Sequence, residues 1–271
     1  MGVTRRVVLK TLVATGVGAI AGPGAYGYLY ERHELAVTRV DVPTSGLPPS
    51  LAGLRVGLLT DIHRSTTVSH DDVSRAVNAL MAERPDVIVL GGDYVTWGDR
   101  QFVGPSADAL SPLSAPHGVF AILGNHDDDH DMPSALGRKG VQVLKDARTR
   151  LTIRGEPLDL VGIRFWTKRQ GDIAELVRGS APATVLLAHD PRRMTEAAAL
   201  SVPLVLSGHT HGGQVVLPVV GAVAARKFPV AAGLVRRERT TMFVSRGIGT
   251  IYVPIRINCP PEVAVLTLQP A

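Results

Sequence analysis

Short apolar runs recur along the chain and predict its strands. Each run is brief, rich in Val, Ile and Leu, and bounded by turn residues, which is typical of a buried strand. We therefore expect buried strands at residues 54–59, 86–90, 118–123, 185–188 and 204–206. Further strands are expected at 36–42, 215–217, 241–245 and 263–268, and a hairpin is expected to join 151–153 to 158–163.

Apolar residues with helical spacing predict helices between these strands. The clearest helix runs from Ser69, a good N-cap, to Arg84, and Pro85 ends it. Two shorter helices are expected at 170–178 and 192–200. Strands alternate with helices in the first half of the chain, and the second half is richer in strands. This order predicts an α/β fold in which two mixed β-sheets pack together with helices outside them.

The composition supports one large domain or two small ones. The chain has 271 residues, of which 45% are hydrophobic, so a sizeable core can form. The net charge is +5, but only 4% of the residues are aromatic and no dense run of Lys and Arg occurs. We interpret the charge as a solvated basic surface and expect no nucleic acid partner. Cys259 is the single cysteine, so no internal disulfide can form.

Residues 1–30 resemble a twin-arginine export signal. Arg5 and Arg6 precede a weakly apolar stretch rich in Gly and Ala, although Val8 stands where such signals usually carry Phe. Cleavage after the small residues 19–21 is one outcome, which Pro23 disfavours, and retention of the segment as a membrane anchor is another. A basic N-terminus before a buried helix is the third interpretation.

Export would give the chain the twin-arginine translocon as a partner. The mature protein would then lie at the outer face of the cytoplasmic membrane, in the cell wall or outside the cell, and the membrane surface is a further possible partner. In this organisation residues 31–53 form a lead-in strand and a linker, and residues 54–271 form the main domain.

Residue types that bind metals follow five of the predicted buried strands. They are Asp61 and His63, then Asp93, then Asn125 with His126, then His189, and finally His209 with His211. Loops at the carboxyl ends of strands are where α/β proteins usually keep their sites. Carboxylates and imidazoles gathered there would be costly without a compensating cation. The pattern therefore predicts a metal site at one edge of the sheets.

The segment from Ser207 to Gln214 is central to this prediction. An extended backbone would point His209 and His211 in opposite directions. The glycines at 208, 212 and 213 permit a tight turn that aims both imidazoles into one pocket. A polar surface turn is the alternative for this segment taken alone.

Taken in order, these motifs resemble the calcineurin-like metallophosphoesterase superfamily. The resemblance rests on Asp-x-His at 61–63, Gly-Asp at 92–93, Gly-Asn-His-Asp at 124–127, the lone His189 and Gly-His-x-His at 208–211. It covers about residues 54–214, and residues 245–249 and 260–262 are similar to one bacterial branch that often carries twin-arginine signals. The resemblance implies a four-layer sandwich in which helices flank two packed sheets.

The resemblance also implies a centre of two divalent metal ions, for which manganese, iron and zinc are all suitable. One ion would be held by Asp61, His63, Asp93 and His211, and the other by Asp93, Asn125, His189 and His209. Asp93 would therefore bridge the two ions. Water between the ions would give hydroxide near neutral pH, and this hydroxide would attack phosphorus in line.

Substrate contacts are implied for Asn125 and His126, and Arg246 is a weaker candidate. His126 would contact a phosphoryl oxygen or protonate the leaving oxygen, with Asp127 orienting its ring. Arg192 and Arg193 are equally consistent with an anionic substrate and with an ordinary helix start.

Other polar groups are interpreted as structural. The histidines outside the motifs are expected to be surface or packing residues, and the acidic run 127–131 to be a solvated loop. These histidines are His33, His70, His117 and His130.

The function that follows is that of an exported two-metal phosphoesterase. It would hydrolyse a phosphodiester, a pyrophosphate or a phosphomonoester, and the branch suggests lipid-linked or nucleotide-sugar substrates. A protein phosphatase and a nuclease are runners-up, but the 57 residues after Gln214 leave little room for a DNA-binding domain. The alternative from another class is a non-catalytic metal-binding protein of the cell envelope, although no ligand position is missing here.

Overall fold

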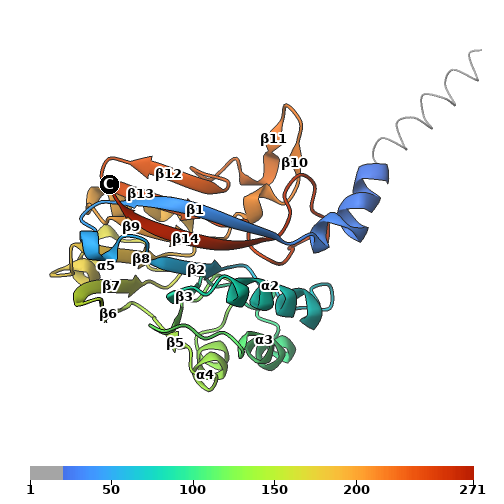
Figure 1. Cartoon of the computed structure of the whole chain (residues 1–271). Coiled ribbons are helices and arrows are strands. Elements are labelled where there is room, and N and C mark those ends of the chain that lie inside the picture. Colours follow the sequence, from blue (N-terminus) through green and yellow to red (C-terminus); the bar gives the residue numbers. More distant parts are fainter. Residues whose placement is uncertain (1–20) are drawn as a thin grey trace, which may run out of the picture.

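Two six-stranded β-sheets pack face to face in the computed structural model, which describes residues 21–271 (Figure 1). The first sheet has the order β1-β14-β2-β3-β4-β5. Its strands are β1 (Ala36–Thr44), β2 (Arg55–Leu59), β3 (Val87–Leu90), β4 (Val119–Ala121), β5 (Gln142–Val143) and β14 (Glu262–Pro270). Strands β2 to β5 are parallel, and β14 is antiparallel to β2 but parallel to β1.

The second sheet has the order β12-β13-β9-β8-β7-β6. Its strands are β6 (Ala147–Ile153), β7 (Glu156–Gly162), β8 (Ala183–Leu187), β9 (Leu204–Ser207), β12 (Gly233–Arg237) and β13 (Thr240–Val244). The four inner strands are parallel, and the two edge strands run antiparallel to their neighbours. A small hairpin of β10 (Val216–Leu217) and β11 (Gly221–Ala222) stands apart from both sheets.

Helices cover the outer faces of both sheets. The helices α2 (His70–Ala82), α3 (Val103–Leu110) and α4 (Asp131–Gly137) share a core with the first sheet. The helices α5 (Gln170–Val177) and α6 (Met194–Ala199) share another core with the second sheet. Figure 1 shows α2, α3 and α4 gathered along the lower side of the first sheet. The predicted α/β fold of two packed mixed sheets with helices outside is therefore confirmed.

Strand β3 is apolar along its whole length, and β9 is apolar up to its last residue, because both faces of these inner strands are buried. In β3, Val87 and Val89 point into the core between the sheets, whereas Ile88 and Leu90 face the helices. In β9, Leu204 and Leu206 enter the same inter-sheet core, and Val205 faces the outer helices. This two-sided burial explains why continuous apolar runs, rather than alternating ones, predicted these strands.

Helix α2 begins as the sequence predicts. The Ser69 hydroxyl accepts a hydrogen bond from the Asp72 N–H (3.1 Å), and the Asp72 carboxylate accepts one from the Ser69 N–H (2.9 Å). His33 lies 2.8 Å from the same carboxylate, so this histidine has a packing partner. Burial alone would raise the pKa of Asp72, because it disfavours the charged carboxylate. The hydrogen bonds to Ser69, His33 and Arg75 outweigh burial and lower this pKa to about 2.

Several elements escape the prediction from sequence. The helices α3 and α4 carry Pro105 and Pro133 in their first turns, where proline costs no hydrogen bond but makes the segment look like a loop. The expected strand 215–217 is only the short β10, and the edge strand β12 lacks a buried face. The last strand, β14, is inserted between β1 and β2.

The described part of the N-terminal region packs onto the main fold. Residues 21–29 are helical, and the Arg256 N–H donates to the Gly27 carbonyl (3.3 Å). The lead-in strand is the edge strand β1, paired along its length with β14. Within residues 21–271 no helix has both the length and the apolar character needed to cross a membrane. Arg5, Arg6, Val8 and all but the last residue of the predicted cleavage site lie outside the described residues.

Candidate metal centre

The predicted ligand residues follow five parallel strands at one end of the sandwich. The strands β2, β3 and β4 are parallel neighbours in the first sheet, and β8 and β9 are parallel neighbours in the second. The loops that follow them converge, as expected for carboxyl ends in an α/β fold. Two groups of ligand-type side chains form there, namely Asp61 with His63 and His211, and Asp93 with His189 and His209.

The first group is buried and closely packed. His211 Nε2 lies 3.5 Å from Asp61 Oδ1 and 3.2 Å from His63 Nε2. His63 Nε2 also lies 3.5 Å from Asp93 Oδ2, so Asp93 reaches the first group. The turn after β9 thus brings His211 back against the loop after β2, as the glycines around it predict.

The second group is centred on Asp93. His189 Nδ1 donates to the Gly91 carbonyl (2.7 Å), which turns His189 Nε2 toward Asp93 Oδ2 at 3.1 Å. The same Nε2 lies 3.8 Å from Asp61 Oδ1, and the His209 N–H donates to both Asp61 oxygens at 3.0 Å. The two groups are therefore adjacent: Asp61 of the first group lies near His189 of the second, and Asp93 of the second lies near His63 of the first.

The backbone at the site is held in an unusual conformation. Five of the seven predicted ligands have positive φ angles, between 48° and 71°. The left-handed region costs a non-glycine residue about 1–3 kcal/mol, and such strain clusters where a structure fixes functional groups. The five residues are Asp61, His63, Asp93, His209 and His211.

Gly124 allows the loop after β4 to approach Asp93 closely. A Cβ atom at this position would overlap the Asp93 carboxylate. Gly124→Ala should therefore displace Asp93, reduce the bound metal per chain and lower activity at least about tenfold, as disturbed ligand orientation does. Metal analysis and rates on one sample test this. Gly104→Ala is the matched control, because nothing lies within 4 Å of a Cβ at this position of α3. Full metal and activity in Gly124→Ala would contradict the expectation.

Burial keeps most of the imidazoles of the site neutral. It lowers the pKa values of His63 and His211 to about 3 and that of His209 to about 4. Burial also acts on His189, but the neighbouring Asp93 charge outweighs it and raises the pKa of His189 to about 10. In turn His189 and His63 lower the pKa of Asp93, although burial opposes this.

The donor set fits divalent cations. Asn125 Oδ1 is buried without a hydrogen-bond partner, which is costly unless another group satisfies it. The Nε2 atoms of the neutral His63 and His211 lie 3.2 Å apart. Without a cation, one of these nitrogens carries a proton and donates it to the other; with a cation, both can be ligands. Mixed oxygen and imidazole ligands suit zinc, iron and manganese.

His126 lies beside the two groups but turns differently from Asn125. Its Nδ1 accepts a hydrogen bond from the backbone N–H of Trp97 (3.0 Å). Its ring also packs edge-on against the indole of Trp97, with the ring centroids 4.5 Å apart. Burial lowers the pKa of His126. Because Nδ1 is an acceptor, the neutral ring carries its proton on Nε2.

Asp127 does not orient the His126 ring, in contrast to the expectation. Its carboxylate accepts hydrogen bonds from the backbone N–H groups of Asp93 (2.7 Å), Tyr94 (2.8 Å) and Gly124 (2.8 Å). Burial, followed by the charge of Asp93, raises the pKa of Asp127 to about 7. Asp127 is therefore a positioning residue that ties the loops after β3 and β4 together, and the acidic run is not solvated at its first residue.

Comparisons with known proteins decide the family. Residues 54–213 match the family model of the calcineurin-like phosphoesterases. The chain belongs to the calcineurin-like phosphoesterase family. An uncharacterized metallophosphoesterase, YkuE of Bacillus subtilis, is 28% identical over 98% of both chains. The phosphodiesterase YaeI of Escherichia coli is 30% identical over 98% of this chain and 99% of that one.

Solved structures show the same fold at low sequence identity. The NAD nucleotidase of Haemophilus influenzae matches with a TM-score of 0.51 and 13% identity, over 72% of this chain and 45% of that one. The sulfate thiohydrolase SoxB of Thermus thermophilus matches with a TM-score of 0.50 and 12% identity, over 74% of this chain and 53% of that one. The chain is thus a metal-dependent phosphoester hydrolase of the calcineurin-like family, with two groups of residues that can bind metals.

Arginines of this phosphoesterase that were considered for substrate binding are engaged elsewhere. Arg246 pairs with the buried Glu262 (3.0 Å), so we leave it out of the proposed substrate site. Arg192 pairs with Asp190 (2.7 Å) and Arg193 with Glu196 (2.6 Å), at the start of a short helix that Asp190 caps. The interpretation of these two arginines as a helix start is therefore the better one.

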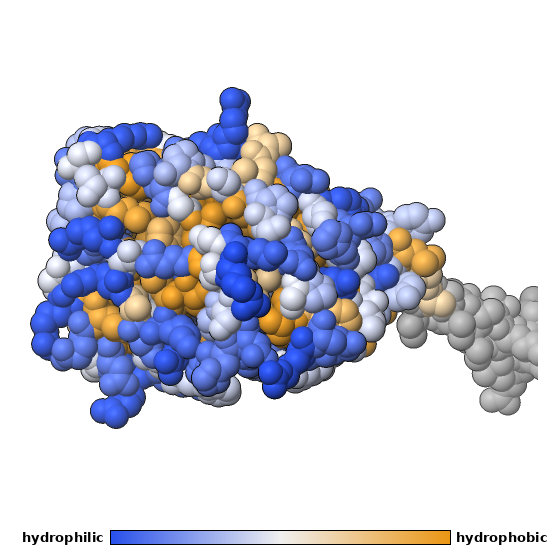
Figure 2. Space-filling view, turned by 90° about the horizontal axis from the view of Figure 1, so that it is seen from below, coloured by the Kyte–Doolittle hydropathy of each residue, from blue (hydrophilic) through white to orange (hydrophobic). Residues whose placement is uncertain are grey.

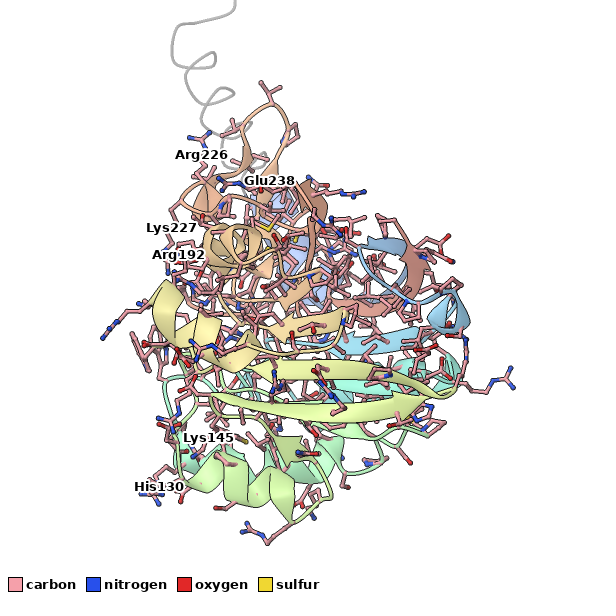
Figure 3. All side chains as sticks on the ribbon, turned by 90° about the vertical axis from the view of Figure 1, so that its left-hand side faces the viewer. His130, Lys145, Arg192, Arg226, Lys227 and Glu238 are labelled. Atoms are coloured by element: carbon pink, nitrogen blue, oxygen red, sulfur yellow. The ribbon has the colours of Figure 1, made fainter. Side chains whose placement is uncertain are left out.

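The remaining histidines lie away from the two groups. His70 begins α2 and is exposed, and His117 lies half-buried before β4. Figure 3 shows His130 at the lower end of the molecule, whereas Lys227 and Arg192 lie toward the opposite end. None of the four belongs to a ligand group among the described residues.

A cavity of about 550 Å³ opens beside the metal groups of the phosphoesterase. Asp93, Asn125, His126, His209 and His211 line its polar side. Much of the remaining lining is apolar and includes Phe228, Ile251, Tyr252 and Val253, with Lys227 beside them, and Phe228 packs edge-on against His209 at 5.2 Å. Sequence reasoning missed these apolar residues and Trp97, although Trp97 follows Asp93 on the same loop and residues 251–253 lie shortly after the branch motif at 245–249.

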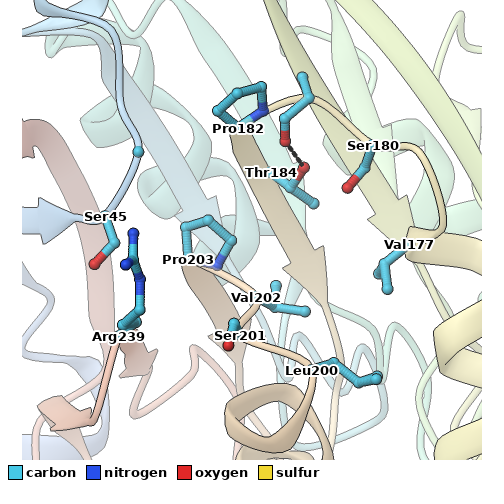
Figure 4. Close-up of a pocket in the computed structure, with 12 residues that line it drawn as sticks. Ser45, Val177, Ser180, Pro182, Thr184, Leu200, Ser201, Val202, Pro203 and Arg239 are labelled. Carbon is cyan, nitrogen blue, oxygen red and sulfur yellow. Dashed lines mark hydrogen bonds between the residues drawn. The ribbon is translucent and has the colours of Figure 1, made fainter.

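A second cavity, of about 390 Å³, lies at the opposite end of β8 and β9 (Figure 4). The hydroxyl of Thr184 in this cavity donates to the Ala181 carbonyl (2.6 Å), and Arg239 is its only ionisable side chain. Its other polar side chains are the hydroxyls of Ser45, Ser180 and Ser201, and the cavity is remote from the metal groups.

Proposed function

We propose that this phosphoesterase hydrolyses a phosphodiester, a pyrophosphate or a phosphomonoester with two divalent metal ions. The observation that carries the proposal is the meeting of the two ligand groups at Asp93, on the polar side of an open cavity, with His126 next to them. The name of the Escherichia coli relative, a phosphodiesterase, favours a diester within this range.

The ligand sets proposed for the two ions share Asp93. One ion would be held by Asp61, His63, Asp93 and His211, and the other by Asp93, Asn125, His189 and His209. Bound divalent ions of manganese, iron or zinc supply positive charge for the phosphoryl oxygens and lower the pKa of water. The left-handed backbone of five ligands fixes their directions before substrate arrives.

Three further residues act on the substrate or on the ligands. His126 donates a hydrogen bond from Nε2–H to a phosphoryl oxygen. Asn125, which lines the same cavity, lies next to this phosphoryl oxygen. Asp127 holds the backbone of Asp93 and Gly124 in place through its accepted hydrogen bonds. The apolar part of the cavity lining, with Lys227 beside it, suits a substrate whose phosphate carries an apolar group, such as a lipid-linked or nucleotide-sugar phosphate.

The experiment is a metal and substrate panel on the natively produced full chain. Elemental analysis gives the metal per chain, and the chelated protein is then reloaded separately with manganese, ferrous iron and zinc. We expect hydrolysis of an aryl phosphodiester only with metal, and a faster rate on one of the lipid-linked or nucleotide-sugar substrates. Two bound ions without turnover on any ester would instead support the non-catalytic envelope protein.

We also propose that the chain is exported by the twin-arginine route and acts outside the cytoplasm. Substituting Lys for both Arg5 and Arg6 keeps the charge but changes the signal that the translocon recognises. The folded variant should stay inside the cell, and fractionation against the unchanged chain measures this. Native levels of the variant outside the cytoplasm would overturn the proposed route.

A further inference from the structure

Exposed apolar and aromatic side chains concentrate at one end of the molecule. Among residues 21–271, all the large ones except Trp166 and Leu234 belong to four segments. These segments are the helical end at 26–30, Trp97, residues 217–223 around the β10–β11 turn, and residues 252–253. We call them the apolar collar, whose exposed members are Tyr26, Tyr28, Leu29, Tyr30, Trp97, Leu217, Val219, Val220, Val223, Tyr252 and Val253.

The segments of the collar are joined by contacts of residues within them or next to them in the sequence. The Arg256 N–H donates to the Gly27 carbonyl, and the neighbouring Ile257 pairs with Val215 beside β10. Gln214 donates to the Val253 carbonyl (2.7 Å), and Tyr252 packs against Trp97 at 5.4 Å. Figure 1 shows the hairpin and the N-terminal helix toward the same end. In Figure 2 a small group of apolar residues is visible at the end where that helix lies, apart from the larger apolar area over the body of the molecule.

The collar has the chemistry of a membrane interface. Four of the five tyrosines of the chain belong to it, and rings with one polar end favour the boundary between lipid and water. The stretches 212–237 and 245–261, which carry its loops, contain no acidic residue, and the exposed Arg226 and Lys227 closely follow the hairpin. Arg226 and Lys227 lie beside the hairpin in Figure 3. This charge is complementary to anionic headgroups.

The collar also borders the mouth of the cavity. Leu217, Val223, Tyr252 and Val253 belong to the collar and line the cavity beside the metal groups. Val219 and Val220 are exposed at the tip of the hairpin and line no described part of the cavity. A surface that covers the collar would therefore face the opening of the site.

We propose that the collar rests on an anionic lipid surface, so that the active site opens toward the headgroups. Residues 1–20 continue from the helix that belongs to the collar, so a retained N-terminal anchor would hold this face against the bilayer. The inference rests on the proposed function and deepens it, because lipid-linked phosphates at the bilayer surface would then lie at the mouth of the cavity. Membrane contact is measured without turnover, so it can fail while hydrolysis stands.

The test uses the full chain and a polarity-sensitive fluorophore on a single introduced cysteine. Cys259 is buried, so a label attaches selectively to Val219→Cys in the collar or to Thr152→Cys as the control. Thr152 is exposed near the β6–β7 turn, where β7 begins, and β7 runs from there toward the end that carries His189. Vesicles of phosphatidylglycerol and phosphatidylethanolamine should shift the Val219 label to the blue and leave the Thr152 label unchanged.

Variants measure the contribution of the collar to binding. Val219→Glu with Val220→Glu should weaken binding to these vesicles at least about tenfold, because buried apolar area is lost and repulsive charge is added. Leu234→Glu, at an exposed apolar position outside the collar, should bind like the unchanged chain. Both variants should keep the rate on a soluble aryl phosphodiester.

Three outcomes would overturn the proposal. The chain could fail to bind anionic vesicles, or could bind phosphatidylcholine vesicles equally well. It could also sediment with anionic vesicles while neither label shifts, which would mean that residues 1–20 tether the protein without contact by the collar. A shift of the Val219 label alone, with weakened binding of the double variant, supports it.

Discussion

Asp93→Ala should lose metal from both ligand groups and lower the rate by about 10³-fold or more, because two-metal catalysis depends on both ions. Asp93 Oδ2 lies 3.1 Å from His189 Nε2 and 3.5 Å from His63 Nε2, so one oxygen faces an imidazole of each group. Its other oxygen accepts the His126 N–H (2.9 Å), so the change also frees the loop after β4. No other predicted ligand makes all three contacts.

Two matched variants make the result specific. His63→Ala removes a ligand of the first group only and should lose chiefly one ion per chain. Asp159→Ala removes another fully buried carboxylate, which pairs with Arg150 (2.8 Å) in the second sheet. It should lower the melting temperature but keep both ions. Elemental analysis of all three variants decides the point, and full metal in Asp93→Ala would refute the shared position.

The fold was predictable wherever burial leaves a simple pattern. Inner strands such as β3 and β9 are apolar on both faces, and α2 has a capping box and a terminating proline. The insertion of β14 between β1 and β2 was not predictable, because its apolar pattern fits any buried position in a sheet. The helices α3 and α4 were missed because a proline in the first turn has no cost in the helix but reads as a loop.

The ligand groups were predictable because the order of strands fixes which loops meet. The roles of individual neighbours were not. Arg246 has the right charge for phosphate, yet the buried Glu262 binds it, and nothing in the local sequence specifies that partner. Asp127 follows His126 directly, yet it turns to three backbone N–H groups of adjacent loops. Such pairings depend on the tertiary approach of distant segments.

The structure also sharpens the expectation for His126. A ring that donates a proton to a leaving group is most effective as the cation, with a proton on both nitrogens. Nδ1 already accepts the Trp97 N–H, so a second proton there would oppose another donor across 3.0 Å. Burial lowers the pKa of His126 in the same direction. The neutral ring can still donate its Nε2–H to charge that develops on the phosphoryl oxygens.

His126→Ala should therefore lose about 10²–10³-fold in rate, the usual effect of removing one donor to developing charge. The loss should be equal on an alkyl and an aryl diester, because the donor acts on the phosphoryl oxygens and not on the leaving group. His126→Gln, whose amide N–H can donate, should recover part of the rate on both esters. Metal content on the same samples should be unchanged. A proton donor would instead give a much larger loss on the alkyl ester, whose leaving group is the stronger base, and glutamine could not rescue it.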